Sequence, residues 1–399
     1  MSFKDVVLVP CFFAQTSLQN ELNLYFEKSS LDPLKTQHVD KSAYSHARKK
    51  LKYEVYHALN NSFLEDVNEQ YLSKRFNGFR VLGIDGTTIK LPQSDCLERE
   101  FGVWNARNGK SSPRARVSAF FDCLNYVAYD CQLDSKDLGE RQQASKNIAN
   151  TELMESDLIV MDRGYASAWL FAQILAKNAD FCVRMPESWK DVKEFKNDPE
   201  RTDEIIQLAL THSAKKQCNK LKISKEDIKI RLVKVLLDNS EIEVLATSIH
   251  SSEYDEIFFK DLYKLRWETE ENYKVIKSVI RIENFIGKTV KAIRQEFFAR
   301  IFMLNISSVI RIEAQRNFDL KEAERRRKNK TSTASKINFK ATLAKIRNAG
   351  VQLFHDIIPQ ALSRMISKVM QDLTAIVPGR SYKRTKRNAK GPFQTYSGI

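Results

Sequence analysis

Residues 80–91 read Arg-Val-Leu-Gly-Ile-Asp-Gly-Thr-Thr-Ile-Lys-Leu, a run of β-branched and apolar residues with one acidic residue, Asp85, in its middle. The run predicts a β-strand, because β-branched side chains fit the pleated surface of a sheet. Asp85 stands inside this strand or at its end, and its carboxylate is a candidate for a catalytic site. The alternative is an ordinary Asp-Gly turn of a β-hairpin, and the stretch by itself leaves both interpretations open.

Other strand patterns follow this run toward the C-terminus, and helical patterns alternate with the later ones. The predicted strands cover residues 115–122, 126–133, 157–162 and 180–185, and the predicted helices cover 137–150, 166–177, 256–281 and 291–316. Residues 228–237 and 241–249 alternate around Asp238-Asn-Ser240 and predict a β-hairpin. Strands in series, then strands alternating with helices, predict an α/β fold with a mixed sheet covered by helices.

A second acidic residue closes one of the short buried strands. Asp162 ends the run Leu158-Ile-Val-Met-Asp and is followed by Arg163-Gly-Tyr165. Open α/β sheets bind ligands at the carboxyl ends of their strands, which favours a site residue here. Asp162 is equally suited to cap the segment that follows, so its position alone does not decide.

The third element is the helical stretch 261–277, which reads DLYKLRWETEENYKVIK. In a helix, the spacing of Tyr263, Arg266, Glu270 and Lys277 brings their side chains within about 60° of one another, on one face. A carboxylate flanked by a hydroxyl and two cations suits a site that holds a metal and phosphates. A solvated helix with ordinary ion pairs is the alternative, since Arg266 and Glu270 have i,i+4 spacing.

These motifs together resemble a known family. The pattern Tyr263-x-x-Arg266-x-x-x-Glu270-x-x-x-x-x-x-Lys277 is similar to the Tyr-Arg-Glu-Lys signature of the insertion-sequence-four transposases. Residues 84–92 resemble that family's first acidic motif, residues 160–165 resemble its second, and the predicted hairpin looks like its β-insert. The resemblance spans about residues 40 to 315, with the motifs in the family's order.

The resemblance implies a ribonuclease H-like core and a metal-dependent enzyme with Asp85, Asp162 and Glu270 as its catalytic residues and metal ligands. Three carboxylates suit two Mg²⁺ ions, with Mn²⁺ as a substitute. Tyr263, Arg266 and Lys277 would then bind DNA phosphates. The implied reaction is cut-and-paste DNA transposition, with cleavage at the terminal inverted repeats of the transposon and strand transfer to target DNA. The implied assembly is a homodimer in a DNA-bound synaptic complex.

The chain is expected to comprise helical flanks around a divided core. We expect a helical, DNA-binding unit at 1–75, the two parts of the core at 76–186 and 250–316, a β-rich insert at 187–249 and a helical basic region at 317–399.

The charge balance agrees with a nucleic-acid partner. Lys and Arg number 65 against 50 Asp and Glu, a net charge of +15, which favours a polyanion. Basic stretches occur at residues 46–52, 321–330 and 380–390. We expect Arg48 and Lys49, in the first of them, to contact DNA phosphates, although an ordinary helical bundle explains the N-terminal pattern as well.

Several classes of protein are excluded or disfavoured. The six cysteines are scattered without a Cys-x-x-Cys pair, which predicts reduced thiols and neither a disulfide frame nor a zinc site. No apolar run of spanning length and no signal-peptide pattern occurs, so we expect a cytoplasmic, nucleoid-associated protein of a bacterium or archaeon with no membrane contact.

Two alternative functions remain open: a catalytically silent DNA-binding regulator, and a nuclease of the same core without strand transfer. Relatives that form a DNA hairpin hold a flipped base against a Trp of the β-insert, and residues 222–262 contain no Trp. Trp189 and Trp267 lie at the start of the insert and in the signature stretch. A hairpin intermediate is therefore not assigned.

Overall fold

The structure is a computed structural model that describes residues 1–13, 16–30, 37–105, 111–237, 241–266, 283–327, 334–355 and 360–376. Its strands are β1 (Arg80–Lys90), β2 (Val103–Asn105), β3 (Ser111–Asp122), β4 (Ala128–Asp134), β5 (Asp157–Met161), β6 (Asp180–Arg184), β7 (Asp203–Leu208), β8 (Ile228–Leu236), β9 (Ile242–Thr247), β10 (Ser335–Ile337) and β11 (Leu373–Ala375). Its α-helices are α1 (Phe3–Leu8), α2 (Leu18–Lys28), α3 (Lys41–Lys50), α4 (Glu54–Tyr71), α5 (Asp95–Phe101), α6 (Glu140–Asn150), α7 (Ala168–Leu175), α8 (Lys190–Asn197), α9 (His212–Leu221), α10 (Glu256–Lys264), α12 (Val290–Arg327), α13 (Phe339–Phe354) and α14 (Ala361–Val369). Short 3-10 turns occupy Val9–Phe12 (η1) and Arg163–Tyr165 (η3).

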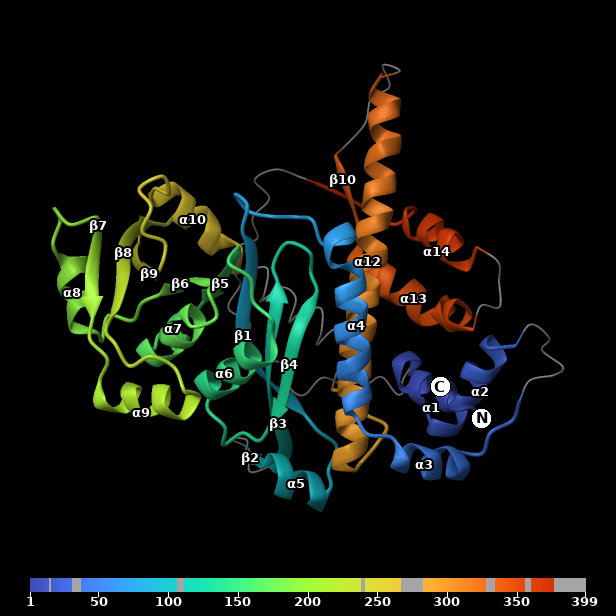
Figure 1. Cartoon of the computed structure of the whole chain (residues 1–399). Coiled ribbons are helices and arrows are strands. Elements are labelled where there is room, and N and C mark those ends of the chain that lie inside the picture. Colours follow the sequence, from blue (N-terminus) through green and yellow to red (C-terminus); the bar gives the residue numbers. More distant parts are fainter. Residues whose placement is uncertain are drawn as a thin grey trace.

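The predicted strand at residues 80–91 is β1, and it lies at the centre of a mixed sheet (Figure 1). On one side β1 pairs antiparallel with β3, which pairs antiparallel with β4; on the other it pairs parallel with β5, which pairs parallel with β6. Helix α6 connects β4 to β5, and α7 connects β5 to β6. This order, β4-β3-β1-β5-β6, is that of a ribonuclease H-like core, and the predicted fold class is confirmed.

The same sheet continues beyond β6 through β9, β8 and β7, all in antiparallel pairing. The predicted hairpin of residues 228–237 and 241–249 is confirmed as β8 and β9, whose last pair is Leu236 with Ile242. The strands of the segment proposed as a β-rich insert therefore extend the central sheet instead of forming a separate one. Helices α8 and α9 accompany them (Figure 1).

Alternating side chains of the central strands pack against different helices on the two faces of the sheet. Leu82, Ile84 and Ile159 belong to a core that includes buried residues of α6 and α7. Val81 and Val160 point to the other face and pack with buried residues of α10. Such alternation is the two-residue period of a β-strand, so each residue's place in the sequence fixes the face of its side chain.

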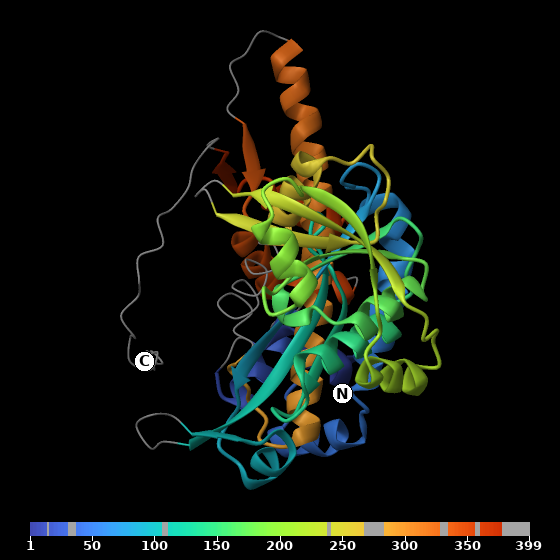
Figure 2. The ribbon, with the colours of Figure 1, turned by 90° about the vertical axis from the view of Figure 1, so that its left-hand side faces the viewer.

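The long helix α12 separates the sheet from most of the remaining helices, and its far end extends beyond them in both views (Figures 1 and 2). It shares a core with residues of α1–α4, α13 and α14 and with the β3–β4 end of the sheet. Residues 41–71 of the predicted helical N-terminal unit form two helices, α3 and α4, because Leu51 between them adopts an extended backbone and is buried in that core. No described helix is both long and apolar enough to cross a membrane.

A buried ion pair joins the amino ends of β1 and β5. Two guanidinium nitrogens of Arg80 donate to Asp157, Nε to Oδ1 at 2.6 Å and Nη2 to Oδ2 at 2.5 Å, and the two side chains are 2% and 0% exposed. The guanidinium also lies 4.6 Å from the centre of the Tyr129 ring. The pair lies at the edge of the sheet opposite to the carboxyl ends of these strands.

Candidate active site

The first two predicted acidic residues lie side by side, Asp85 in the middle of β1 and Asp162 directly after the end of β5. Ile84 of β1 pairs with Met161 of β5 in the last pair of their parallel ladder, so the next residues, Asp85 and Asp162, are neighbours, although β1 itself continues to Lys90. Residues in register on parallel neighbours point to the same face, and the strands lie about 4.8 Å apart. Both aspartates are partly exposed. The structure thus brings together two carboxylates from chain positions 85 and 162.

Both carboxylates point to the face that α10 covers. Asp85 follows Val81 and Gly83 at two-residue spacing, and Asp162 follows Leu158 and Val160, whose side chains pack with α10. The row continues in β6, because Val183 pairs with Met161 and Arg184 is therefore the neighbour of Asp162.

Arg184 is engaged with a further acidic residue in this row. Its Nη2 lies 2.7 Å from Oε1 of Glu243, a residue of β9 that is 8% exposed overall. Burial raises the pKa of Glu243, and the charges of Arg184 and Arg266 partly offset this effect. The row that crosses the sheet therefore contains three acidic groups, Asp85, Asp162 and Glu243, and one basic group, Arg184.

Two residues of the predicted signature stretch lie against this row. Tyr263, near the end of α10, and Arg266, just after it, are 5% and 6% exposed, and the guanidinium lies 5.4 Å from the centre of the Tyr263 ring. Burial raises the pKa of Tyr263; the charge of Arg266 opposes this, and the charge of Asp162 adds to it. The buried Tyr263 hydroxyl has no hydrogen-bond partner among the described residues. It stays protonated at neutral pH and can donate a hydrogen bond.

On the other side of β1, Tyr165 closes the site from the α6 face. Its hydroxyl would lie 3.1 Å from a Cβ placed on Gly86, so a side chain at Gly86 would press on the ring. Burial raises the pKa of Tyr165, and the charges of Asp85, Glu140 and Asp162 raise it further. Its hydroxyl is buried without a hydrogen-bond partner in the described part of the chain. Tyr165 therefore forms an uncharged floor beneath the acidic residues.

The third predicted acidic residue, Glu270, lies outside the described residues, and so do Lys277 and Trp267. Within the described ranges, no group of three His, Cys, Asp or Glu side chains is arranged to hold a metal ion. The donors that are described, two adjacent and partly exposed carboxylates, have the hard oxygen chemistry that suits Mg²⁺. They fit two of the three positions of the predicted ligand set.

The structure gives Arg48 a different environment from the predicted one. Arg48 is 7% exposed; its Nε donates to Gln295 at 2.6 Å, and its Nη1 lies 3.0 Å from Oε1 of Glu296. A guanidinium bonded in this way is not presented to a DNA phosphate, which argues against the predicted contact. Lys49 is exposed, and its predicted contact with DNA stays a prediction. The basic stretch 380–390 lies outside the described residues.

Arg184 and Glu243 were not predicted as site residues from the sequence. The signal for Arg184 was present, since it ends a short buried strand as Asp162 does. Glu243 gave no such signal: it stands within an alternating hairpin strand, where a polar residue normally faces solvent. Only the pairing of β9 with β6 brings it to Arg184.

Most of the chain matches the model of a known protein family. The family described as "Transposase DDE domain" matches residues 77–306, more than half of the chain. Among solved structures, a piggyBac transposase synaptic complex with hairpin DNA matches with a TM-score of 0.42 and 10% identity, over 96% of this chain and 77% of that chain. No curated protein sequence matches this chain.

Proposed function

Because the chain belongs to the transposase DDE-domain family and is thus a DNA transposase, we propose that it performs metal-dependent cut-and-paste transposition with Asp85, Asp162 and Glu270. The observation that carries this proposal is the in-register placement of Asp85 and Asp162 on the face that α10 covers. The resemblance of residues 263–277 to the Tyr-Arg-Glu-Lys signature supports a proposed assignment to the insertion-sequence-four group. Its substrates would be terminal inverted repeats and target DNA, bound by a homodimer at the nucleoid.

In this proposal Asp85, Asp162 and Glu270 would hold two Mg²⁺ ions, for which Mn²⁺ can substitute. Bound there, the metal supplies charge stabilisation at the scissile phosphate and lowers the pKa of the attacking water or 3′-hydroxyl. The chain's own residues do the positioning. Tyr263 and Arg266, which are buried next to each other in the structure, would bind phosphate oxygens when DNA occupies this face, and Lys277 would add a further positive charge.

Replacing Arg266 with Lys is expected to impair end binding and cleavage about tenfold or more. The lysine keeps the charge but loses the planar, two-pronged geometry with which a guanidinium binds phosphate. Excision, end binding and a thermal melt of the same variant are the measurements. A loss of cleavage that is matched by a fall in melting temperature would instead mean that the lysine disturbs the buried packing of Arg266 on Tyr263. If Arg266→Lys excises like the wild type, Arg266 does not bind DNA.

The basic C-terminal stretch predicts a steep salt dependence of DNA binding. If residues 380–390 bind phosphates, deleting Arg380–Ile399 should flatten the plot of log affinity against log salt by about 0.9 for each phosphate that the protein no longer neutralises. Charge reversal at an exposed residue of the N-terminal stretch, Lys49→Glu, tests the other predicted phosphate-binding position in the same assay. A slope that neither change alters would show that these stretches are solvated surfaces.

The function itself is tested with a supercoiled plasmid that carries the DNA flanking the gene, incubated with the full-length protein and Mg²⁺. Excision at defined ends followed by insertion into a second plasmid supports the proposal. Nicking without end specificity would favour the nuclease, and binding without cleavage would favour the silent regulator. Omitting the metal should abolish cleavage but leave a DNA complex.

A further inference from the structure

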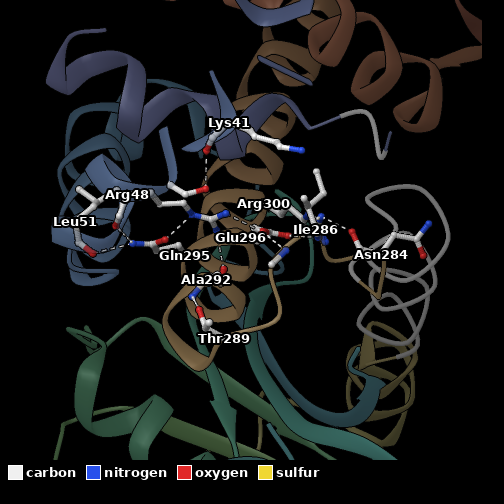
Figure 3. Close-up of polar contacts among 12 residues, drawn as sticks. Lys41, Arg48, Leu51, Asn284, Ile286, Thr289, Ala292, Gln295, Glu296 and Arg300 are labelled. Atoms are coloured by element: carbon white, nitrogen blue, oxygen red, sulfur yellow. Dashed lines mark hydrogen bonds and ion pairs between the residues drawn. The ribbon is translucent and has the colours of Figure 1, made fainter. Parts of the chain in front are cut away.

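A cluster of charged side chains is buried where α3 meets α12, far along the chain from the acidic residues of the active site (Figure 3). Glu296 of α12 is 0% exposed, and Arg48 and Arg300 are 7% and 4% exposed. Arg48 Nη1 lies 3.0 Å from Oε1 of Glu296, and Arg300 Nη2 lies 3.7 Å from Oε2. Burying three charges is costly unless each is paired and hydrogen-bonded, so the chain has a specific arrangement here.

The cluster holds backbone as well as side chains. The carboxylate of Glu296 accepts hydrogen bonds from the N–H groups of Ile286 and Gly287, both at 2.9 Å. Arg300 Nη2 donates to the carbonyl oxygen of Asn284 at 2.7 Å. Figure 3 shows these residues aligned from α3 through α12 to the 284–287 backbone. The charged groups therefore fix the backbone of residues 283–288, which we call the strap.

The strap is tied to the sheet at its other side. The backbone N–H of Lys90, the last residue of β1, donates to Oε1 of Glu283 at 3.0 Å. The Cys96 thiol, in α5, donates to the carbonyl oxygen of Lys288 at 3.4 Å. The strand that carries Asp85 and the helix that carries Glu296 thus hold the same short piece of chain.

Gly287 shows how closely the strap approaches α12. A Cβ at this position would lie 2.4 Å from the Cβ of Ala292 and 3.0 Å from Oε1 of Glu296. The first of these atoms is fixed to the helix backbone, so a side chain at 287 would push the strap away. Gly287 is required by this close approach.

We propose that the buried Arg48–Glu296–Arg300 cluster and the strap are positioning elements for the third catalytic acidic residue. The inference rests on the proposed assignment of Glu270. Residues 267–282 carry Glu270 and Lys277. Before them, α10 packs on β1 and β5 and Arg266 lies over the Tyr263 ring; after them, the strap is held to β1 and α12. The chain is thus anchored on both sides of these residues, and displacements of about 1 Å matter at catalytic sites.

The test uses the full-length protein with Gly287→Ala and Glu296→Gln. In Glu296→Gln the new amide group replaces one of the two acceptor oxygens that face N–H and guanidinium donors. Amide hydrogen exchange at Ile286 and Gly287 should become faster in both variants, since their bonds to Glu296 are broken or lengthened. The Mg²⁺ concentration for half-maximal plasmid cleavage should rise about tenfold or more, as when a group that orients a metal ligand is removed. DNA binding without metal should change little.

The matched control is Arg80→Lys, which perturbs another buried ion pair, at the opposite edge of the sheet. It should lower the melting temperature without changing the Mg²⁺ requirement or exchange in the strap. If Glu296→Gln fails to fold, Arg300→Lys removes the planar donor to Asn284 and keeps the charge beside Glu296. An unchanged Mg²⁺ requirement in folded Gly287→Ala with faster exchange in the strap would overturn the inference.

A different result would overturn the proposed function. Cleavage retained in Asp85→Asn and Glu270→Gln would overturn the catalytic assignment, whatever the strap variants do. Cleavage abolished in those two variants, together with a wild-type Mg²⁺ requirement in Gly287→Ala and Glu296→Gln, would overturn the positioning role alone.

Discussion

Replacing Asp85 with Asn is expected to slow DNA strand cleavage at least about a thousand-fold, equivalent to roughly 4 kcal/mol of transition-state stabilisation. The change keeps the size of the side chain and removes its negative charge, so the strand pairing with Ala119 and the flanking core should survive. Asp162→Asn should have an effect of the same order, because Asp162 directly follows β5 and lies beside Asp85. Single-turnover cleavage of a plasmid bearing the ends, with DNA binding and a thermal melt in parallel, measures the effect.

A control for this prediction exists in the same sheet. Asp180 stands at the amino end of β6, at the opposite edge, where its Oδ1 accepts a hydrogen bond from the Ser248 hydroxyl at 2.6 Å. Asn at position 180 can still accept that bond, so Asp180→Asn should cleave like the wild type. Equal activity in Asp85→Asn and Asp180→Asn would mean that the carboxylate of Asp85 takes no part in the chemistry.

The largest expected loss of stability follows removal of one member of the Arg80–Asp157 pair. Arg80→Met should lower the free energy of unfolding by about 3–5 kcal/mol, because it leaves the Asp157 carboxylate buried without its cation. Chemical denaturation monitored by circular dichroism gives the value. A loss below about 1 kcal/mol would put the pair in the class of exposed ion pairs.

The double variant Arg80→Met/Asp157→Asn separates charge burial from packing. Asn at position 157 can still accept the hydrogen bond that the Met154 N–H now donates to Asp157 Oδ2 at 2.8 Å. The double variant should therefore be more stable than Arg80→Met alone, since no uncompensated charge remains buried. A double variant no more stable than the single one would show that packing of the guanidinium on the Tyr129 ring dominates.

Local patterns in the sequence were enough to predict the central strands and the two described acidic residues. The apolar runs before Asp85 and Asp162 are long enough to be strands, and an acidic residue at the end of a buried strand is an unusual choice without a ligand or a cap. What those runs could not give was the register, which depends on the pairing of strands more than 70 residues apart. The family resemblance supplied the expectation that the two residues meet.

Arg48 shows why the prediction from local charge was not sufficient. It stands among Lys49, Lys50 and Lys52, and such a run normally marks a solvated surface. Its burial depends on Gln295 and Glu296, which follow it by more than 240 residues. The 3.6-residue period places Arg48 on the same side of α3 as Tyr44, which is 0% exposed. The prediction of a phosphate contact followed the basic run and not this helical period. Nothing in the sequence around Glu296 indicated that this residue would be buried against Arg48.

The late position of α12 in the sequence delays the packing of the N-terminal helices while the chain is being synthesised. Helix α4 packs on α12, yet more than 200 residues separate the end of one from the start of the other. A ribosome that adds roughly 5–20 residues per second needs on the order of 10 to 40 s to make that stretch. During this time buried residues of the N-terminal helices, such as Leu22 and Tyr44, lack the surface that later covers them. The nascent chain should therefore be a client of cellular chaperones until α12 has left the exit tunnel.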